Sequence, residues 1–244
     1  MQQAYRMLRV VAETQTIRMV FAFAPGKLLL RELVSACTAL TQENSSGIKA
    51  VVLDFQDHTG TGDKDADNQA VSENDLHQAI QAVQALQPPV LAVVRSTLSP
   101  IASQLIQVAD LILVAQTAVL SLTTQDNTGK AKDTRPETLT GAEALRLGLV
   151  SWSVPARAID TEVERVLDIL RNKSGVALRL TKASVRMGTS TNTSASNSKT
   201  PASTRLDALK QVNEFYLTHV MQTTDAAEGL RAFLEKRRPR WKNQ

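Results

Sequence analysis

The sequence predicts an α/β core over residues 1–155 and an all-helical region over residues 156–244. Three observations lead to this fold class. Up to residue 115, short apolar runs of strand length alternate with longer segments whose apolar residues recur at helical spacing. Strands that alternate with helices pair mainly in parallel, because each helix returns the chain to the same end of the sheet. Beyond residue 155 the pattern is helical.

The elements of the core follow from local patterns. The expected strands are residues 7–13, 17–24, 48–55, 90–94 and 111–115, which are rich in apolar and β-branched side chains. The expected helices are residues 28–44, 73–87 and 140–150; Pro88-Pro89 ends the second, and Thr140 is the expected N-cap of the third. Polar loops are expected at residues 56–69 and 125–137, where no apolar periodicity is present.

The C-terminal region is predicted to contain four helices. They are residues 160–172, 174–187, 205–221 and 225–237. Residues 188–204, between the second and the third, are rich in Ser, Thr and Asn. This segment is too polar to bury, so we expect it to be flexible.

Composition limits the classes of function. Hydrophobic residues make up 43% of the 244 residues, but their runs have strand length and are too short to span a membrane. The N-terminus shows no secretory signal pattern, and the lone Cys37 excludes an internal disulfide, so we expect a reducing, cytoplasmic location. The net charge of +4 comes largely from the basic stretch at residues 231–242. Such a cluster favours phosphate-bearing partners, or it complements the dipole of a helix end.

Three stretches carry a family resemblance that covers nearly the whole chain. They are "PPVLAVVRSTLSPIASQLIQVADLILVAQTAVLSL" (88–122), "LTGAEALRLGLVSWSVP" (139–155) and "TTDAAEGLRAFLEKRRPRWK" (223–242). In this order they resemble the crotonase superfamily, the enoyl-CoA hydratase/isomerase family, and the chain is similar to a divergent member. The resemblance implies a crotonase-like ββα spiral core and a C-terminal helical region that forms trimers, or hexamers of paired trimers.

The resemblance also implies a ligand and a type of chemistry. The expected ligand is an acyl-CoA or a carrier-bound acyl thioester, with no further cofactor required. Reactions of the family pass through an enolate-like thioester oxyanion that two backbone N–H groups hold in an oxyanion hole. Preorganised donors of this kind stabilise the transition state because they need no reorganisation as charge develops.

The two oxyanion positions fall on different kinds of residue. The first falls on Gly62 in "GTGDK", where a small residue lets a ligand approach the backbone. The second is a Gly-Gly-Gly turn in the family, and here it reads Pro100-Ile101-Ala102. Proline has no N–H. The donor position falls on Ile101, whose branched side chain would stand where the thioester lies, so the second position is degenerate.

The acid and base groups of the family have no clear counterpart. Gln104 stands at a family glutamate position and cannot exchange a proton at neutral pH. His58 and Asp63, in the loop that holds Gly62, are the candidate substitutes, and an exposed histidine with no catalytic role is the alternative for His58. The stretch at 119–139 lacks the second family glutamate. No group of side chains has metal-ligand spacing.

Candidate residues for CoA come from the same motifs. Lys64 follows the first oxyanion loop, and Phe233 and Lys236 match positions that contact CoA in the family. Lysine suits a phosphate-rich ligand, whereas helix packing is an equally good reason for Phe233. The sequence thus leaves three functions open: an acyl-thioester isomerase, hydratase or decarboxylase-type lyase; a non-catalytic trimeric binding or scaffold protein, in effect a pseudoenzyme; and RNA binding through the basic tail.

Overall fold

The computed structural model describes residues 5–42, 47–56, 71–122, 137–193 and 201–243. Its main sheet has six strands in the order β1-β2-β3-β4-β5-β8. The strands are β1 (Leu8–Glu13), β2 (Thr16–Phe21), β3 (Ala50–Phe55), β4 (Val90–Val94), β5 (Leu111–Ala115) and β8 (Trp152–Val154). β1 and β2 form an antiparallel hairpin, and every other neighbouring pair in this sheet is parallel. A second, antiparallel pair joins β6 (Val119–Leu122) to β7 (Glu137–Thr140).

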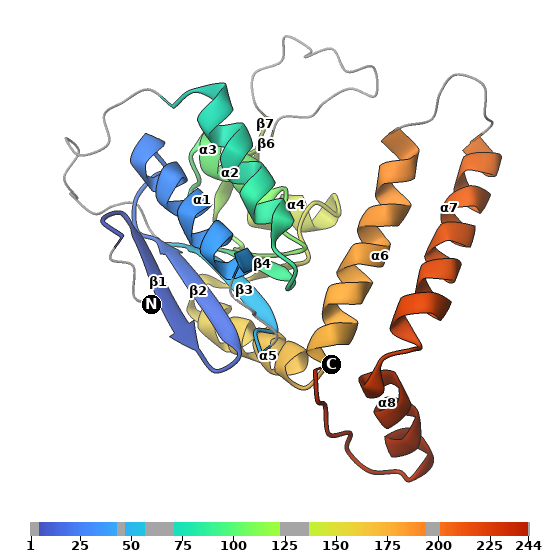
Figure 1. The fold of residues 1–244 in the computed structure, drawn as a ribbon. Helices are drawn as coiled ribbons and strands as arrows, with labels where there is room; N and C mark the ends of the chain where they lie inside the picture. The colour runs from blue at the N-terminus through green and yellow to red at the C-terminus, as the bar shows by residue number, and fades with distance from the viewer. Residues whose placement is uncertain (1–4, 43–46, 57–70, 123–136, 194–200, 244) are drawn as a thin grey trace.

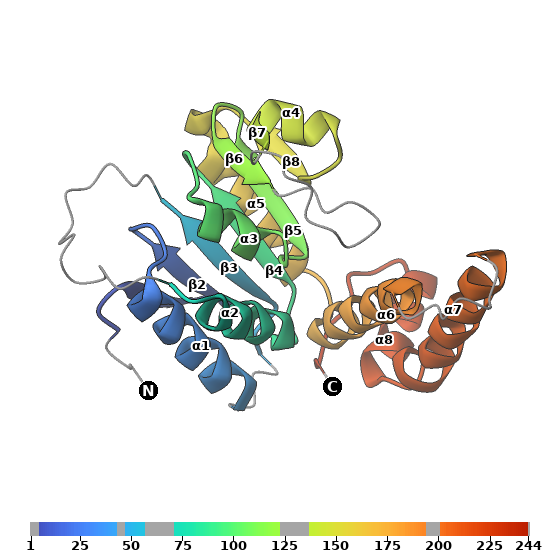
Figure 2. The same ribbon diagram turned by 90° about the horizontal axis from the view of Figure 1, so that it is seen from above.

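Helices cover both faces of the sheet. In the core they are α1 (Lys27–Gln42), α2 (Glu73–Ala85), α3 (Pro100–Ile106), α4 (Gly141–Arg146), the short 3₁₀ helix η1 (Ala156–Ala158) and α5 (Ile159–Arg171). Figure 1 shows α1 and α2 side by side on one face of the sheet and α5 on the other. The C-terminal helices are α6 (Gly175–Thr193), α7 (Pro201–Phe215), the π-helical turn η2 (Tyr216–Val220) and α8 (Thr224–Leu234). They stand beside the core rather than on it (Figure 2).

The structure confirms the α/β fold class, and it differs from the predicted elements in two places. Helix α6 runs to Thr193 and α7 begins at Pro201, so both helices extend into the polar segment 188–204, whose flexibility stays a prediction. The strands β6, β7 and β8 were not predicted. All three are short, and β7 reads Glu-Thr-Leu-Thr, so its pairing with β6 rather than its apolar content makes it a strand.

The core is a layer of apolar side chains between the sheet and its helices. Phe21 and Phe55, on neighbouring strands, stack with ring centroids 4.4 Å apart. Cys37 lies fully buried on α1 within the same layer. Burial raises the pKa of its thiol to about 12, because a thiolate would lose its hydration there. Cys37 is therefore a packing residue and not a nucleophile.

A buried carboxylate ties three elements of the core together. The Asp54 side chain, on β3, is only 2% exposed and accepts hydrogen bonds from Arg18 Nη1 at 3.1 Å and Arg95 Nε at 2.9 Å. Arg95 also donates to Asp160 at the start of α5, at 2.7 Å. Burial lowers the pKa of Arg95, but its hydrogen bonds to Asp54 and Asp160 outweigh this and raise the pKa. The network fixes α5 and the segment after β4 against β3.

Helix α4 approaches β5 so closely that its first residue must be glycine. The Gly141 N–H donates to the Ala118 carbonyl at 2.8 Å. A Cβ on Gly141 would lie 2.1 Å from the Ala115 carbonyl oxygen and 2.7 Å from Val114 Cγ2. The capping box of Thr140 and Glu143 holds the helix at this point. The Thr-Gly pair of the 139–155 motif is therefore a packing requirement.

Replacing Gly141 tests this requirement. Gly141→Ala should lower the free energy of unfolding by about 3 kcal/mol, because backbone atoms cannot yield to the new methyl group. The matched control is Gly47→Ala, where no atom lies within 4 Å of the added Cβ, and the expected change is within about 0.5 kcal/mol. Urea denaturation measures both. Equal stability of the two variants would show that α4 can shift away from β5.

Candidate functional site

The candidate site lies where the chain leaves the carboxyl ends of β3 and β4. These strands are parallel neighbours, with Phe55 paired to Val94, so the segments that follow them leave the same edge of the sheet. The Arg95 N–H donates to the Phe55 carbonyl at 3.2 Å and extends this contact beyond the strands. Open α/β sheets bind ligands outside the carboxyl ends of their strands. The topology thus brings the chain immediately after β3 and the turn that follows β4 to one edge.

The first oxyanion segment lies outside the described part of the chain. The predicted residues His58, Gly62, Asp63 and Lys64 fall within residues 57–70, so their roles stay predictions. The second segment is described in full. It is the turn that leads from β4 into α3.

The N-cap side chain of α3 accepts a hydrogen bond from one of the backbone amides that the start of a helix leaves without a partner. Ser99 is the N-cap, and its Oγ accepts a hydrogen bond from the Ala102 N–H at 3.2 Å. Pro100 fills the first helical position, where its missing N–H and fixed φ suit the helix. The Ser103 N–H donates to the Ser99 carbonyl at 2.9 Å. Within the described part of the chain, the Ile101 N–H alone of this turn has no acceptor.

The turn is held by hydrogen bonds to β6 and by packing on the apolar core. The Leu98 N–H donates to the Val119 carbonyl at 3.0 Å, and the Ser121 N–H donates to Ser103 Oγ at 3.2 Å, so β6 lies against α3. The Ile101 side chain is partly buried and packs on the apolar core. Gln104, one turn further on, is also partly exposed. The first turn of α3 therefore offers one backbone donor, the Ile101 N–H, and Gln104 adds a side-chain amide that cannot transfer a proton.

The Ser99-Pro100 pair is a signal that the sequence analysis did not use. Serine followed by proline is typical of an N-cap and first position of a helix. With that pattern, the Ala102 N–H is expected to donate to the serine side chain and not to a ligand. The sequence analysis compared the turn only with the Gly-Gly-Gly of the family, and so it missed this contact.

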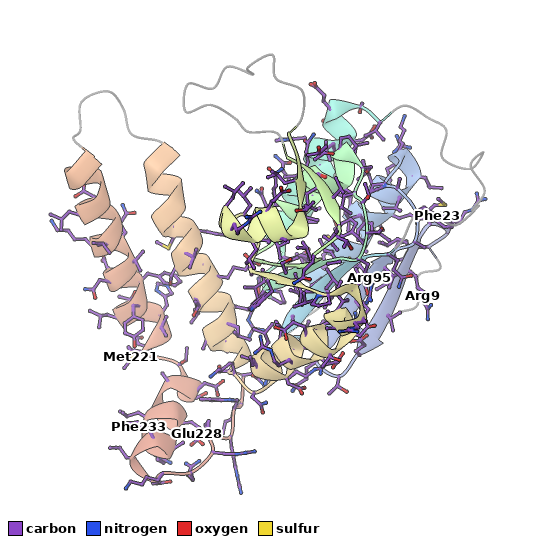
Figure 3. All side chains as sticks on the ribbon, turned by 180° about the vertical axis from the view of Figure 1, so that it is seen from behind. Arg9, Phe23, Arg95, Met221, Glu228 and Phe233 are labelled. Atoms are coloured by element: carbon purple, nitrogen blue, oxygen red, sulfur yellow. The ribbon has the colours of Figure 1, made fainter. Side chains whose placement is uncertain are left out.

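The predicted CoA-binding residues of the C-terminal region lie far from this turn within one chain. Phe233 is 79% exposed on α8, and Lys236 follows the helix with φ of +53°. Figure 3 shows Phe233 and Met221 on the C-terminal helices, away from the sheet. One copy of the chain therefore does not bring Phe233 or Lys236 together with Ile101.

The motif at residues 223–242 folds the end of the chain back onto α6. Asp225, 2% exposed, accepts hydrogen bonds from Ser174 Oγ at 2.5 Å and from the backbone N–H groups of Lys242 and Asn243 at 2.8 and 3.0 Å. The Asn243 Oδ1 in turn accepts from the Gly175 N–H at 2.8 Å. These contacts join the start of α6, the start of α8 and the last residues. The sequence analysis used this motif for the family resemblance and for the CoA candidates, and it missed this role of Asp225.

Glu228 fixes the turn that follows α8. Its carboxylate accepts from Arg237 Nη1 at 2.6 Å and from the Arg240 N–H at 2.7 Å. Both hydrogen bonds lower the pKa of Glu228, to about 2, and the one from Arg237 has the larger effect. Gly229 leaves room for the ring of Trp241, which would lie 3.4 Å from an added Cβ. One arginine of the basic tail is thus already paired.

The Glu228 contacts predict that the stability of the fold depends on pH. Because the folded pKa lies below the ordinary value of 4.5, the stabilisation is full above pH 4.5 and is lost as the pH falls through about 2. Glu228→Gln should therefore melt below the wild type at pH 6, and the gap should narrow toward pH 2. Differential scanning calorimetry at several pH values measures the gap. Glu214→Gln, an exposed change on α7, is the control and should match the wild type throughout. A gap for Glu228→Gln that is constant over this pH range would contradict the assignment.

No helix in the described part of the chain is both long and apolar enough to cross a membrane. No group of three or more His, Cys, Asp or Glu side chains in the described ranges could hold a metal ion.

Comparisons with solved structures define the fold. No family profile matches the chain, and no curated protein matches it. An enoyl-CoA hydratase from Mycobacterium smegmatis superposes with a TM-score of 0.74 at 21% identity, over 97% of this chain and 99% of that one. An enoyl-CoA hydratase/isomerase from Mycobacterium paratuberculosis gives 0.75 at 17% identity, over 99% and 100%. An enoyl-CoA hydratase from Bacillus anthracis gives 0.70 at 21%, over 98% and 100%.

These similarities extend over essentially the full length of both chains in each pair. At such low identity they establish the fold. The chain therefore has the fold of enoyl-CoA hydratase/isomerase proteins, the crotonase fold, as the sequence resemblance predicted.

Proposed function

We propose that this chain binds an acyl thioester, of CoA or of an acyl carrier, beside the turn that leads from β4 into α3, and that it does not hydrate enoyl thioesters through a pair of glutamates. The full-length likeness to enoyl-CoA hydratases supports the ligand class. The observation that carries the proposal is the first turn of α3. It keeps one amide, that of Ile101, without an acceptor among the described residues.

The proposed binding uses the Ile101 N–H as a donor to the thioester carbonyl. An unused amide in the first turn of a helix is a good partner for a polarised oxygen. The Ala102 N–H is unavailable because Ser99 Oγ accepts from it, and Pro100 has none. A second donor would come from Gly62, with His58 or Asp63 as the acid or base. With these groups the protein would catalyse an isomerase, hydratase or decarboxylase-type reaction, and the rate of that reaction would be low.

The non-catalytic alternative rests on Gln104. The side chain at the family glutamate position is a neutral amide, and the turn beside it is held by β6 through Leu98 and Ser103. A protein of this kind would bind a thioester and leave it unchanged. Loss of one preorganised oxyanion donor costs roughly 100- to 1000-fold in rate, so a degenerate turn with no acid group is consistent with a binding protein.

An assay with crotonyl-CoA tests the proposal. Calorimetric titration should show binding, while the rate of hydration should stay below about 1 per second, the lower end of the usual enzyme range. Ile101→Gly with Gln104→Glu should increase the hydration rate, since the double change frees space at the donor and supplies a carboxyl group. Gln107→Glu, an exposed change just beyond α3, is the matched control and should leave the rate unchanged.

The outcomes separate the alternatives. Wild-type turnover within about 1–1000 per second would overturn the claim of degenerate catalysis. Absence of heat with crotonyl-CoA, and equally with an acyl-carrier thioester, would overturn the claim of binding. Binding without turnover of any thioester would favour the non-catalytic form over the slow enzyme.

We also propose that the chain assembles through its C-terminal helices into a homotrimer, or a hexamer of two trimers. These helices expose many large apolar side chains: Leu206, Leu209, Leu217, Met221, Leu230, Phe233 and Leu234 are each 47–79% exposed. Exposed apolar surface on this scale is typical of subunit contacts. In such an assembly, Phe233 and Lys236 of one copy could approach the candidate site of another, which they do not reach within one chain.

Light scattering after size exclusion tests the assembly. The wild type should have three or six times the mass of the 26.6 kDa chain, and Leu209→Glu should reduce it. Leu147→Glu introduces the same charge at a side chain of similar exposure, 63% against 66%, at the end of α4. It should leave the mass unchanged. A monomeric wild type at micromolar concentration would rule the assembly out.

A further inference from the structure

The strand β1 has an outer edge that no other element covers in the described part of the chain. It is the outermost strand of the six-stranded sheet, and no described helix or strand lies along its outer side (Figure 1). Arg9, on this strand, lies on the side of the molecule away from the C-terminal helices (Figure 3). An exposed strand edge is a template for pairing with a further strand. The edge of β1 is therefore a candidate interaction surface, separate from those helices.

The pairing of the neighbouring strand β2 shows which residues of β1 direct their backbone groups outward. The Phe21 carbonyl, on β2, accepts from the Gln56 N–H at 3.1 Å, so the backbone groups of Phe21 point toward β3. Leu8 is paired with Phe21 across the hairpin, so the backbone groups of Leu8 point away from β2. The direction alternates along an antiparallel strand. The N–H and C=O groups of Val10 and Ala12 therefore point outward as well.

A side chain of α1 closes one end of this edge. The Glu32 carboxylate accepts hydrogen bonds from three consecutive backbone N–H groups, those of residues 6–8, at 2.8–2.9 Å. Within the described ranges, the outward groups of Val10 and Ala12 have no hydrogen-bond partner, and both residues are exposed. The open part of the edge thus consists of two residues, each with one N–H and one C=O.

A second copy of β1 supplies the matching groups in one antiparallel register. When Val10 of one copy lies opposite Ala12 of the other, the two residues exchange both hydrogen bonds, and a two-fold axis repeats the exchange. Four hydrogen bonds form, and none of them uses an amide that the carboxylate of α1 already holds. In this register Val11 faces its own counterpart on the axis. On either side of the axis, Arg9 of one copy faces Glu13 of the other.

The neighbouring registers match less well. A shift by two residues in one direction places Ala12 opposite Leu8, whose N–H is already taken by α1. The same shift in the other direction carries Val10 past the end of the facing strand. Both shifts separate Arg9 from Glu13. A shift by one residue sets outward backbone groups against residues whose own groups point toward β2, so the hydrogen bonds cannot form.

Charge favours the same register. Arg9 is exposed, and no described residue forms an ion pair with it. Glu13 belongs to a network of ion pairs between the sheet and α5. Among the described residues this network joins five carboxylates to three guanidinium groups, which are those of Glu13, Asp54, Asp160, Glu164 and Asp168 and of Arg18, Arg95 and Arg171. The network carries more negative than positive charge, and Arg9 of a second copy would add a cation to it. Opposite charges that face each other across two strands stabilise the pairing.

We propose that the edge of β1 binds a second copy of the chain, with the two β1 strands antiparallel about a two-fold axis at Val11. The exposed backbone groups supply the hydrogen bonds, and the facing of Arg9 with Glu13 sets the register. The contact uses no residue of α3 and none of the helices α6, α7 and α8. It is therefore independent of the proposed thioester site and of the proposed assembly through the C-terminal helices.

Disulfide formation between two copies tests the register. At Val11 the facing residues form a non-hydrogen-bonded pair, whose Cα atoms lie about 4.5 Å apart, within the range that a disulfide requires. Val11→Cys should therefore give a covalent dimer on mild oxidation, measured by non-reducing electrophoresis. Ala12→Cys is the matched control, because this position is more exposed but lies diagonal to its counterpart. At a separation of about 7–8 Å it should cross-link at least about 10-fold more slowly. The buried Cys37 should not contribute.

Light scattering separates this contact from the C-terminal assembly. The mass should be an even multiple of the 26.6 kDa chain: two chains if the C-terminal helices do not associate, and six if they form trimers. Arg9→Glu sets like charges opposite each other at both ends of the paired strands, so it should halve the mass at the same concentration. Arg157→Glu makes the same change at an exposed arginine beyond β8, at the other edge of the sheet, and should leave the mass unchanged.

Two results would overturn the proposal. A wild-type mass of one or three chains would show that β1 does not pair, and a mass of three would leave the C-terminal assembly standing. Cross-linking of Ala12→Cys as fast as that of Val11→Cys would show that the copies do not meet in this register.

Discussion

The parallel pairing of β3 with β4 determines where the candidate site lies in this molecule. It brings the segment after Phe55 and the segment after Val94 to one edge, and the Asp54–Arg95 contact, 2.9 Å between Oδ1 and Nε, fixes the second segment to the first strand. The turn into α3, the β6 strand that holds this turn and α5 beneath the sheet all depend on that edge. The hydrogen bonds of the parallel ladder thus position the candidate site before any ligand is considered.

Packing and capping at this edge determine how many amides of the turn are left without an acceptor among the described residues. Ser99 and Pro100 make a well-capped helix start, and a well-capped start has few amides left for a ligand. Local stability and ligand binding compete for the same N–H groups. Here the Ala102 N–H belongs to Ser99, and the branched side chain of Ile101 packs on the core.

Periodicity and turn residues were enough to predict the α/β core, the parallel strands and most helices. They failed where pairing alone makes the structure, as in the polar strand β7, which is defined by its partner β6. They also failed where a side chain acts over a long distance in sequence. Asp225 reaches Ser174 and Asn243, and no local pattern contains that contact. For the candidate site, the missing N–H of Pro100 follows from the sequence, and the Ser99-Pro100 pattern of a capped helix start was also present in the sequence but was not used.

The lone thiol has a practical consequence for studying how the C-terminal helices sit against the sheet. Cys37 is fully buried and its pKa is raised, so we expect thiol-directed probes not to react with the native chain. A cysteine placed at an exposed position on α7 and another on α4 would take spin labels without removal of the natural residue. Distances between such labels would then report the arrangement of the helical arm in solution.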